Sequence, residues 1–408
     1  MWLKLLDHGL GALVSEGDLV LCLPDGSRRR YGDGTGRQVV VHLHDPALVR
    51  RLVRNPALAV GEGYMDGTLT VEGDDLHGLT GLGTRAVAAR RGAAWHRAAA
   101  LMRQALRSVE QFNPAARARA NVAHHYDLSG ALYDLFLDSD RQYSCAYFTR
   151  PDMTLEEAQA AKKAHVAAKL LLRPGMRVLD IGCGWGGLAL DLARNHGVEV
   201  LGVTLSREQH QAACARAQAE GLADRAVFRL MDYRDVTGQF DRIVSVGMFE
   251  HVGVPQYRAF FDTLRGLLTD DGVALVHTIG RAPPPGSTNP WISKYIFPGG
   301  YVPALSEVMA AVEREGLWQT DIEIWRLHYA ETLRHWLARF EANLDKAQVL
   351  YDARFCRMWR FYLVACEQTF RLNRQCVFQL QLARKQDAVP LTRDYLYRPP
   401  PALAHAAE

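Results

Sequence analysis

The feature that most constrains the fold of this sequence is a glycine-dense loop, GCGWGG at residues 182–187, placed directly after the apolar segment 178–181. A pattern with helical periodicity follows the loop. Glycines let the backbone pass close to a ligand, and the free N–H groups at the start of the helix point toward that ligand. We therefore expect a strand–loop–helix unit that binds a small molecule, within a sheet covered by helices.

The surrounding pattern supports such a sheet. Thr154 and Glu157 form a capping box before a helix predicted over residues 155–172. Further helices are predicted at 187–195, 207–220 and 256–268, interleaved with strands at 177–181, 199–203, 226–230, 240–246 and 272–278. Five strands alternating with helices predict an α/β fold with a doubly wound parallel sheet. Beyond them we expect a strand at 322–327 and two long amphipathic helices at 328–345 and 351–385.

The identity of the ligand depends on the acid in the loop's strand. The glycine spacing also fits a dinucleotide fingerprint, but Asp180 stands two residues before the first glycine, where it would repel a pyrophosphate. The second strand is followed by Thr204-Leu205-Ser206 rather than by an acid that could hold a ribose. The loop therefore favours the cationic amino-acid ligand S-adenosylmethionine (SAM). A dinucleotide site and a turn that binds nothing are the alternatives.

The N-terminal part of the chain has a different pattern of predicted secondary structure. Short β-like runs at 19–23, 39–43 and 69–71 predict a small α+β module, and a helical pattern covers 85–111. Between residues 84 and 120 the chain carries eight arginines and one acid, a balance of +7 in a protein whose total is +3. Two interpretations stay open, a solvated helix face and a surface that docks on anionic lipid.

Composition excludes several classes of protein. The 408 residues are 48% hydrophobic and 23% charged, which excludes a disordered chain, a coiled coil and a collagen-like fibre. No run of 18 apolar residues and no signal peptide is apparent, and the small net charge predicts no nucleic-acid partner. Seven cysteines without a CxxC pair, and no HExxH motif, predict a cytoplasmic protein without a disulfide framework or a metal site.

Between about residues 121 and 330 the sequence resembles the cyclopropane fatty acid synthase family, which includes the mycolic acid cyclopropane synthases. The matching motifs keep the family's order: His125-Tyr126-Asp127, QYSCAYF at 142–148, VLDIGCGWGG at 178–187, GVTLSxxQ at 202–209, FDRIVS at 240–245, MFEHVG at 248–253, HTIG at 277–280, IFPGG at 296–300 and His328-Tyr329. The resemblance implies a class I SAM-dependent methyltransferase domain over 154–396. It also implies an N-terminal lipid- or membrane-binding domain over 1–112 and a linker with an active-site-covering helical segment over 113–153.

The resemblance implies a reaction as well. A cis double bond in a phospholipid acyl chain attacks the methyl group of SAM, and loss of a proton from that methyl group closes a cyclopropane ring. Members of the family use bound bicarbonate as the base. The residues carried over as its ligands are Cys145, Glu250, His277, Ile279 (through its backbone) and Tyr329. Taken alone, Cys145 would be interpreted as a buried structural cysteine. We therefore assign its backbone, and not its thiol, to the bicarbonate site.

The residues expected to bind SAM are Tyr143, Ser144, Asp180, Gly182, Gly184, Gly186, Thr204, Leu205, Gln209, Asp232 and Tyr233. Membrane phospholipids with unsaturated acyl chains are the expected partners, met by peripheral contact at the inner face of the membrane. A homodimer is expected by resemblance alone. Two alternatives remain: a relative that makes methyl-branched chains or methylates an amine, and a non-catalytic membrane-binding protein with a relic SAM fold.

Overall fold

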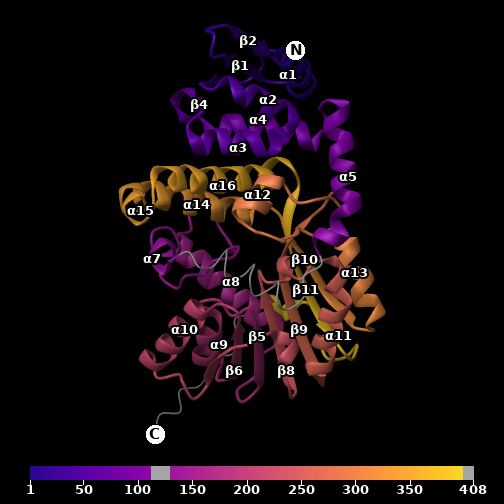
Figure 1. The fold of residues 1–408 in the computed structure, drawn as a ribbon. Coiled ribbons are helices and arrows are strands. Elements are labelled where there is room, and N and C mark those ends of the chain that lie inside the picture. The colour runs from indigo at the N-terminus through magenta and orange to yellow at the C-terminus, as the bar shows by residue number, and fades with distance from the viewer. Residues whose placement is uncertain (112–128, 398–408) are drawn as a thin grey trace.

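A computed structural model describes residues 1–111 and 129–397 of the chain. An N-terminal module, a layer of long helices and a large α/β sheet follow one another along the molecule (Figure 1). The His125-Tyr126-Asp127 motif, Arg117, Arg119 and the first part of the predicted linker, residues 113–128, lie outside the described residues.

The large sheet has seven strands in the order β10-β11-β9-β8-β5-β6-β7. Their bounds are β5 Arg177–Ile181, β6 Glu199–Thr204, β7 Ala226–Leu230, β8 Phe240–Val246, β9 Leu268–Arg281, β10 Trp318–Trp325 and β11 Gln375–Ala383. The five strands β5 to β9 pair in parallel, whereas β11 is antiparallel to both β9 and β10. The predicted α/β sheet is therefore confirmed, with β11 and then β10 added beside β9 by antiparallel pairing.

Helices cover both faces of this sheet. On one face lie α8 (Leu155–Leu170), α9 (Gly187–His196) and α10 (Arg207–Ala219), whose apolar side chains form one buried cluster with the strands. On the other face lie α11 (Tyr257–Leu267) and α13 (Leu305–Arg314). The capping box predicted for the start of α8 is present.

Two helix predictions were wrong. The helix expected over 351–385 ends at Leu372, and the chain then forms β11. Residues 379–382 read Gln-Leu-Gln-Leu, a period-two alternation typical of a strand, and Arg374 takes a left-handed turn just before it. The helical pattern over 85–111 is likewise broken between α4 (Leu76–Ala88) and α5 (Ala94–Glu110), where Arg90 and Gly92 have positive φ angles.

The N-terminal module is built around a four-stranded sheet in the order β2-β1-β3-β4. The strands are β1 Asp18–Cys22, β2 Arg28–Tyr31, β3 Gln38–Leu43 and β4 Leu69–Val71, packed with α1 Trp2–Leu13, α2 Pro46–Arg54, α3 Pro56–Asp66 and α4. The α+β character expected for this part is present.

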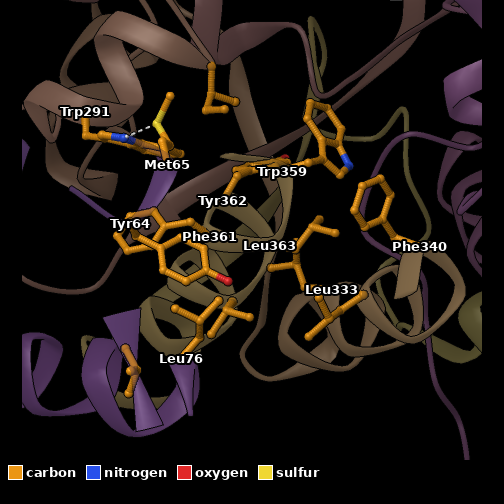
Figure 2. Close-up of a cluster of buried hydrophobic side chains, with 14 of the residues drawn as sticks. Tyr64, Met65, Leu76, Trp291, Leu333, Phe340, Trp359, Phe361, Tyr362 and Leu363 are labelled. Carbon is orange, nitrogen blue, oxygen red and sulfur yellow. Dashed lines mark hydrogen bonds between the residues drawn. The ribbon is translucent and has the colours of Figure 1, made fainter. Parts of the chain in front are cut away.

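The module packs on the helical layer through one shared apolar core. This layer comprises α7 Gly130–Tyr133, α12 Pro290–Tyr295, α14 His328–Ala342, α15 Leu344–Leu350 and α16 Ala353–Leu372. Figure 2 shows Tyr64 and Met65 of α3 among side chains of α12 and α16. The indole Nε1 of Trp291 donates to the Met65 sulfur at 3.1 Å, and its ring meets Phe361 edge-on at 4.8 Å.

Gly61 makes this close packing possible. A Cβ atom at this position would lie 2.4 Å from the Nε1 of Trp291, far inside van der Waals contact. Ion pairs close the edge of the same interface, with Lys294 bound to Glu62 at 2.7 Å and Arg354 to Asp66 at 2.8 Å. The N-terminal module is therefore held against α12 and α16 by apolar packing and by charge.

Candidate functional site

The glycine loop connects β5 to α9 in conformations that side chains disfavour. Gly182 has a φ of 82° and Gly186 a φ of 83°. A Cβ on Gly182 would lie 2.8 Å from the Cβ of Met248, and one on Gly186 would lie 2.9 Å from Ala213 and Phe228. Gly182 therefore keeps the loop close to the segment after β8, and Gly186 lets α9 pack against its neighbours.

A cavity of about 160 Å³ opens at this loop, beside the carboxyl ends of β5, β6 and β8. Ligands of open α/β sheets bind at this edge. Of the residues predicted to bind the cofactor, Gly186 alone does not line the cavity, because it packs against Ala213 and Phe228. The others line it: Tyr143, Ser144, Asp180, Gly182, Gly184, Thr204, Leu205, Gln209, Asp232 and Tyr233.

Asp180 supplies buried negative charge to the cavity. Its side chain is almost fully buried, and its Oδ2 has no hydrogen-bond partner among the described residues. Burial raises the pKa of Asp180 to about 7. A cationic ligand group would satisfy this oxygen and stabilise the ionised form, so the residue fits the ammonium of an amino-acid ligand.

Lys162, which the sequence did not single out, supports the part of the cavity wall formed by Gln142 and Ser144. Its Nζ is fully buried and donates to Gln142 Oε1 at 2.5 Å and to Ser144 Oγ at 2.9 Å. Burial lowers the pKa of this ammonium to about 8. A signal was present in the sequence, since Lys162 and Lys169 are two turns apart on the apolar face of the predicted helix.

Other contacts order the rim of the cavity. Asp232 accepts two hydrogen bonds from the Arg234 guanidinium, at 2.8 and 2.6 Å, and the Thr204 hydroxyl donates to Gln209 Oε1 at 3.0 Å. The Tyr233 ring meets Phe260 edge-on. Other lining residues were not predicted as binding residues, among them Arg141, Met248, His251 and Gln256. Burial lowers the pKa of His251 to about 4, so its ring is neutral at physiological pH.

A second group of predicted residues lies outside the lining of this cavity. Glu250 belongs to the short helix Phe249–His251 after β8, and its Oε1 accepts the backbone N–H of Ile279 at 2.6 Å. Its Oε2 is buried and has no partner among the described residues. Burial raises the pKa of Glu250 to about 7. This carboxyl group is therefore fixed by one oxygen and presents the other to the interior.

His277 precedes Ile279 by two residues on β9, so both side chains project from the same face of the sheet. Its ring meets Trp325 edge-on at 5.1 Å. Trp325 belongs to a small buried cluster with Cys145 and Val377, and Tyr329 packs at the border of that cluster. The structure thus joins Glu250 to Ile279 directly, and links His277, Cys145 and Tyr329 through the apolar cluster around Trp325.

The environment of Cys145 disfavours thiolate chemistry. The side chain is completely buried, and burial raises the pKa of its thiol well above the usual value. The Sγ–H donates to the carbonyl of Ala146 at 3.3 Å. Cys145 therefore stays protonated, in agreement with its assignment through the backbone.

Comparison with known proteins identifies the family. Residues 114–380 match the model of mycolic acid cyclopropane synthetases, and residues 16–80 match a domain of unknown function. The chain is 39% identical to the cyclopropane-fatty-acyl-phospholipid synthase of Escherichia coli over 348 residues, 84% of this chain and 87% of that protein. The chain belongs to the cyclopropane synthase family. It is a SAM-dependent methyltransferase, as its loop and motifs predicted.

Two further members of the family extend the comparison. A probable fatty acid methyltransferase of Pseudomonas putida is 36% identical over 400 residues, 93% of this chain and 96% of that protein. A crystal structure of a mycolic acid cyclopropane synthase with SAH and CTAB matches with a TM-score of 0.62 at 36% identity, covering 67% of this chain and 99% of that chain. The class I methyltransferase fold is thus confirmed, and the match to the Pseudomonas putida protein, over 93% of this chain, also covers the N-terminal module.

Proposed function

We propose that this chain transfers a methylene group from SAM across the cis double bond of unsaturated phospholipid acyl chains, forming a cyclopropane ring. The observation that carries the proposal is the buried group behind the SAM-type cavity. There Glu250, whose Oε2 has no partner among the described residues, accepts the N–H of Ile279, two residues beyond His277 on β9, beside an apolar cluster. A transfer to an amine requires no such group, because no carbocation has to lose a proton.

The cavity residues have distinct parts in holding SAM. Asp180 binds the ammonium of the methionine moiety, and the glycine loop passes beneath it. Asp232 and Tyr233 lie at the end of the cavity assigned to the adenosine, where the Tyr233 ring offers an apolar face. Lys162 holds Gln142 and Ser144 on the wall nearest the buried group. The methyl group is thereby directed toward the interior of the protein.

In the first step an alkene carbon forms a bond to the methyl carbon while the carbon–sulfur bond breaks. SAH leaves, and a carbocation remains on the acyl chain. Water or a strong nucleophile would trap this cation, so the site has to be dry. The cluster of Cys145, Trp325 and Val377 is buried, and the thiol within it stays protonated and weakly nucleophilic. These residues preserve the cation until it loses a proton.

The second step needs a weak base, and the residues present fit a bicarbonate ion. The free Oε2 of Glu250 suits the hydroxyl of that ion, and His277 and the Tyr329 hydroxyl are suitable donors to its oxygens. Bicarbonate bound there would supply the base that removes a proton from the transferred methyl group. The Ile279 N–H donates to Glu250 in this structure, so we assign it first to holding that carboxyl group.

The substrate is reached from the membrane surface. The described helices include none that is both long and apolar enough to cross a membrane. On α4 and α5, however, Val87, Leu101 and Met102 are 61–67% exposed, within the arginine-rich segment of the sequence. Apolar side chains among arginines suit peripheral contact with an anionic bilayer, here the inner face of the cytoplasmic membrane. We also retain the domain limits 1–112, 113–153 and 154–396, and a homodimer, as parts of this proposal.

The decisive experiment incubates the purified protein with SAM and vesicles of unsaturated phospholipid. Cyclopropane formation predicts a gain of one CH₂, loss of the alkene signals and appearance of ring methylene protons in the NMR spectrum of the lipid. A methyl-branched product would lack the ring protons, and an unchanged alkene would overturn the assigned substrate. Binding to vesicles that is indifferent to anionic lipid and to salt would contradict the membrane surface on α4 and α5.

A further inference from the structure

We propose that Gln379 is a positioning residue for His277, which fixes the imidazole tautomer that presents an N–H to the bound anion. This inference rests on the function proposed above. It concerns a residue on β11, a segment in which the sequence patterns predicted no functional residue.

The contact between the two residues is direct and fully buried. The amide Nε2 of Gln379 lies 3.0 Å from the Nδ1 of His277, and the two residues are 0% and 2% exposed. They are directly opposite each other in the antiparallel pairing of β11 with β9. Gln379 is also opposite Glu323 in the pairing with β10. His277, Gln379 and Glu323 therefore form one row of side chains across three strands.

The chemistry of an amide nitrogen decides the tautomer. A neutral imidazole has one nitrogen that donates and one that accepts, and an amide –NH₂ group only donates. The Nδ1 of His277 therefore accepts from Gln379, and the ring hydrogen is carried by Nε2. A histidine whose second nitrogen is held in this way presents a single defined donor to its ligand.

The groups around this row keep the His277 ring neutral, so its tautomer decides which ring nitrogen can donate to the anion. Lys162, His165 and Lys169 of α8 and Glu323 of β10 are the charged or titratable groups that act on His277. Burial and the two lysines lower the pKa of His277 well below its usual value, so the ring is neutral. A glutamine holds the ring without adding a charge. A carboxylate at this place would favour the imidazolium, which would protonate a weakly basic anion and abolish its function.

Fold stability alone does not account for a glutamine here. The Oε1 of Gln379 is buried and has no hydrogen-bond partner among the described residues. Burying an acceptor without a partner is unfavourable, and an apolar side chain of similar length would avoid it. The contact to His277 is the one interaction of the Gln379 side chain that the structure records.

The test uses full-length protein in which Gln379→Met removes the amide at nearly constant length. Gln381→Met is the matched control, because Gln381 lies two residues away on β11, is equally buried, and donates to the Lys169 carbonyl. Nitrogen NMR of protein labelled in its histidines reports the tautomer, and a His277→Gln variant identifies the signals of His277. We expect the Nε2–H form in the wild type and in Gln381→Met, and its loss in Gln379→Met.

Kinetics supply the second readout. Gln379→Met should raise the bicarbonate concentration needed for half-maximal rate by about tenfold or more, as typically follows loss of a residue that orients an ion ligand, and should leave SAM binding unchanged. Gln379→Glu is a second variant in case the first fails to fold. In it the Nδ1 of His277 should carry a proton, and the activity should fall on the acid side of the pH profile.

An unchanged His277 tautomer together with an unchanged bicarbonate response in Gln379→Met would overturn the proposal. Equal effects in Gln381→Met would also overturn it, because they would reveal a general disturbance of β11. If the wild-type protein forms no product, the proposed function fails, and the NMR comparison still decides whether Gln379 sets the tautomer.

Discussion

The phenol oxygens of Tyr143 and Tyr362 lie 3.0 Å apart and join the cofactor cavity to helix α16. Tyr362 is fully buried, and its neighbour Phe361 packs against Tyr64 of the N-terminal module. One helix therefore contacts the cavity and the module through adjacent residues. A change in the docking of the module has a short route to a residue that lines the cavity.

The first prediction tests this route. Tyr362→Phe removes one hydroxyl group and keeps the packing, so SAM affinity should fall about 3- to 10-fold, the effect of one hydrogen bond of about 1 kcal/mol. Isothermal titration of SAM measures the change. Tyr31→Phe is the control, because its hydroxyl bonds Asp7 within the N-terminal module and its loss should leave SAM binding unchanged. Equal losses in both variants would contradict the route.

Asp180 should make the ligand-free protein less stable as the pH rises. Its pKa is about 7 in the folded state and 3.8 when unperturbed, so the folded protein holds the proton more tightly. This contribution to stability is complete below about pH 4 and is lost as the pH rises through 7. At pH 8 the Asp180→Asn variant should therefore have a free energy of unfolding on the order of 1–3 kcal/mol above that of the wild type, and a higher melting temperature. Its SAM affinity should fall about 10- to 100-fold.

Thermal unfolding at pH 6 and pH 8, with titration of SAM, checks both halves of this prediction. Asp224→Asn, at an exposed position before β7, is the control and should change neither quantity. A difference in melting temperature between Asp180→Asn and the wild type that is the same at both pH values would show that the carboxyl group is not the source of the effect.

Lys162 should matter for SAM binding more than for folding. A buried ammonium carries a desolvation cost, so Lys162→Met should leave the free energy of unfolding unchanged or raise it. The variant removes the anchor of Gln142 and Ser144, and SAM affinity should fall by about tenfold. Lys163→Met is the control, because Lys163 pairs instead with Asp140 and Asp191. A strong loss of stability in Lys162→Met, with SAM affinity retained, would reverse this assignment.

Gly61 should be intolerant of a single added methyl group. Gly61→Ala would place a carbon 2.4 Å from the Trp291 indole, and the forced shift should lower the free energy of unfolding by about 1–3 kcal/mol. Gly83→Ala is the control, because beyond its chain neighbours and the backbone of its own helix no atom lies within 4 Å of the added carbon, and alanine favours the helix by up to about 1 kcal/mol. Urea unfolding of the two variants should therefore give changes of opposite sign.

The parts of the site that local chemistry determines could be predicted from the sequence. The loop at 182–187 is specified by glycines with left-handed φ angles, and the parallel strands around it are marked by their own apolar runs. Motif resemblance added Glu250, Ile279 and His277, which the structure brings onto neighbouring segments.

The remaining parts depend on contacts between distant segments, which periodicity does not encode. The place of Lys162 on the apolar face of its helix could be read from the sequence, but its partners Gln142 and Ser144 come beside it only in the folded chain. Residues 375–383 follow a long helix without a proline or glycine between them, so the pattern suggested that the helix continued. Their strand is stabilised by pairing with β9 and β10, which end 94 and 50 residues before β11 begins.

Because of the position of β11, the large sheet can be completed only after nearly the whole described chain has been synthesised. It is the last strand of the described chain, yet it lies inside the sheet, between β9 and β10. A nascent chain that ends before residue 375 leaves β9 as an open edge and β10 without a partner strand. It also lacks Gln379 opposite His277. Premature chains should therefore be inert and should expose strand edges to chaperones and proteases, and the site is complete only once β11 has paired.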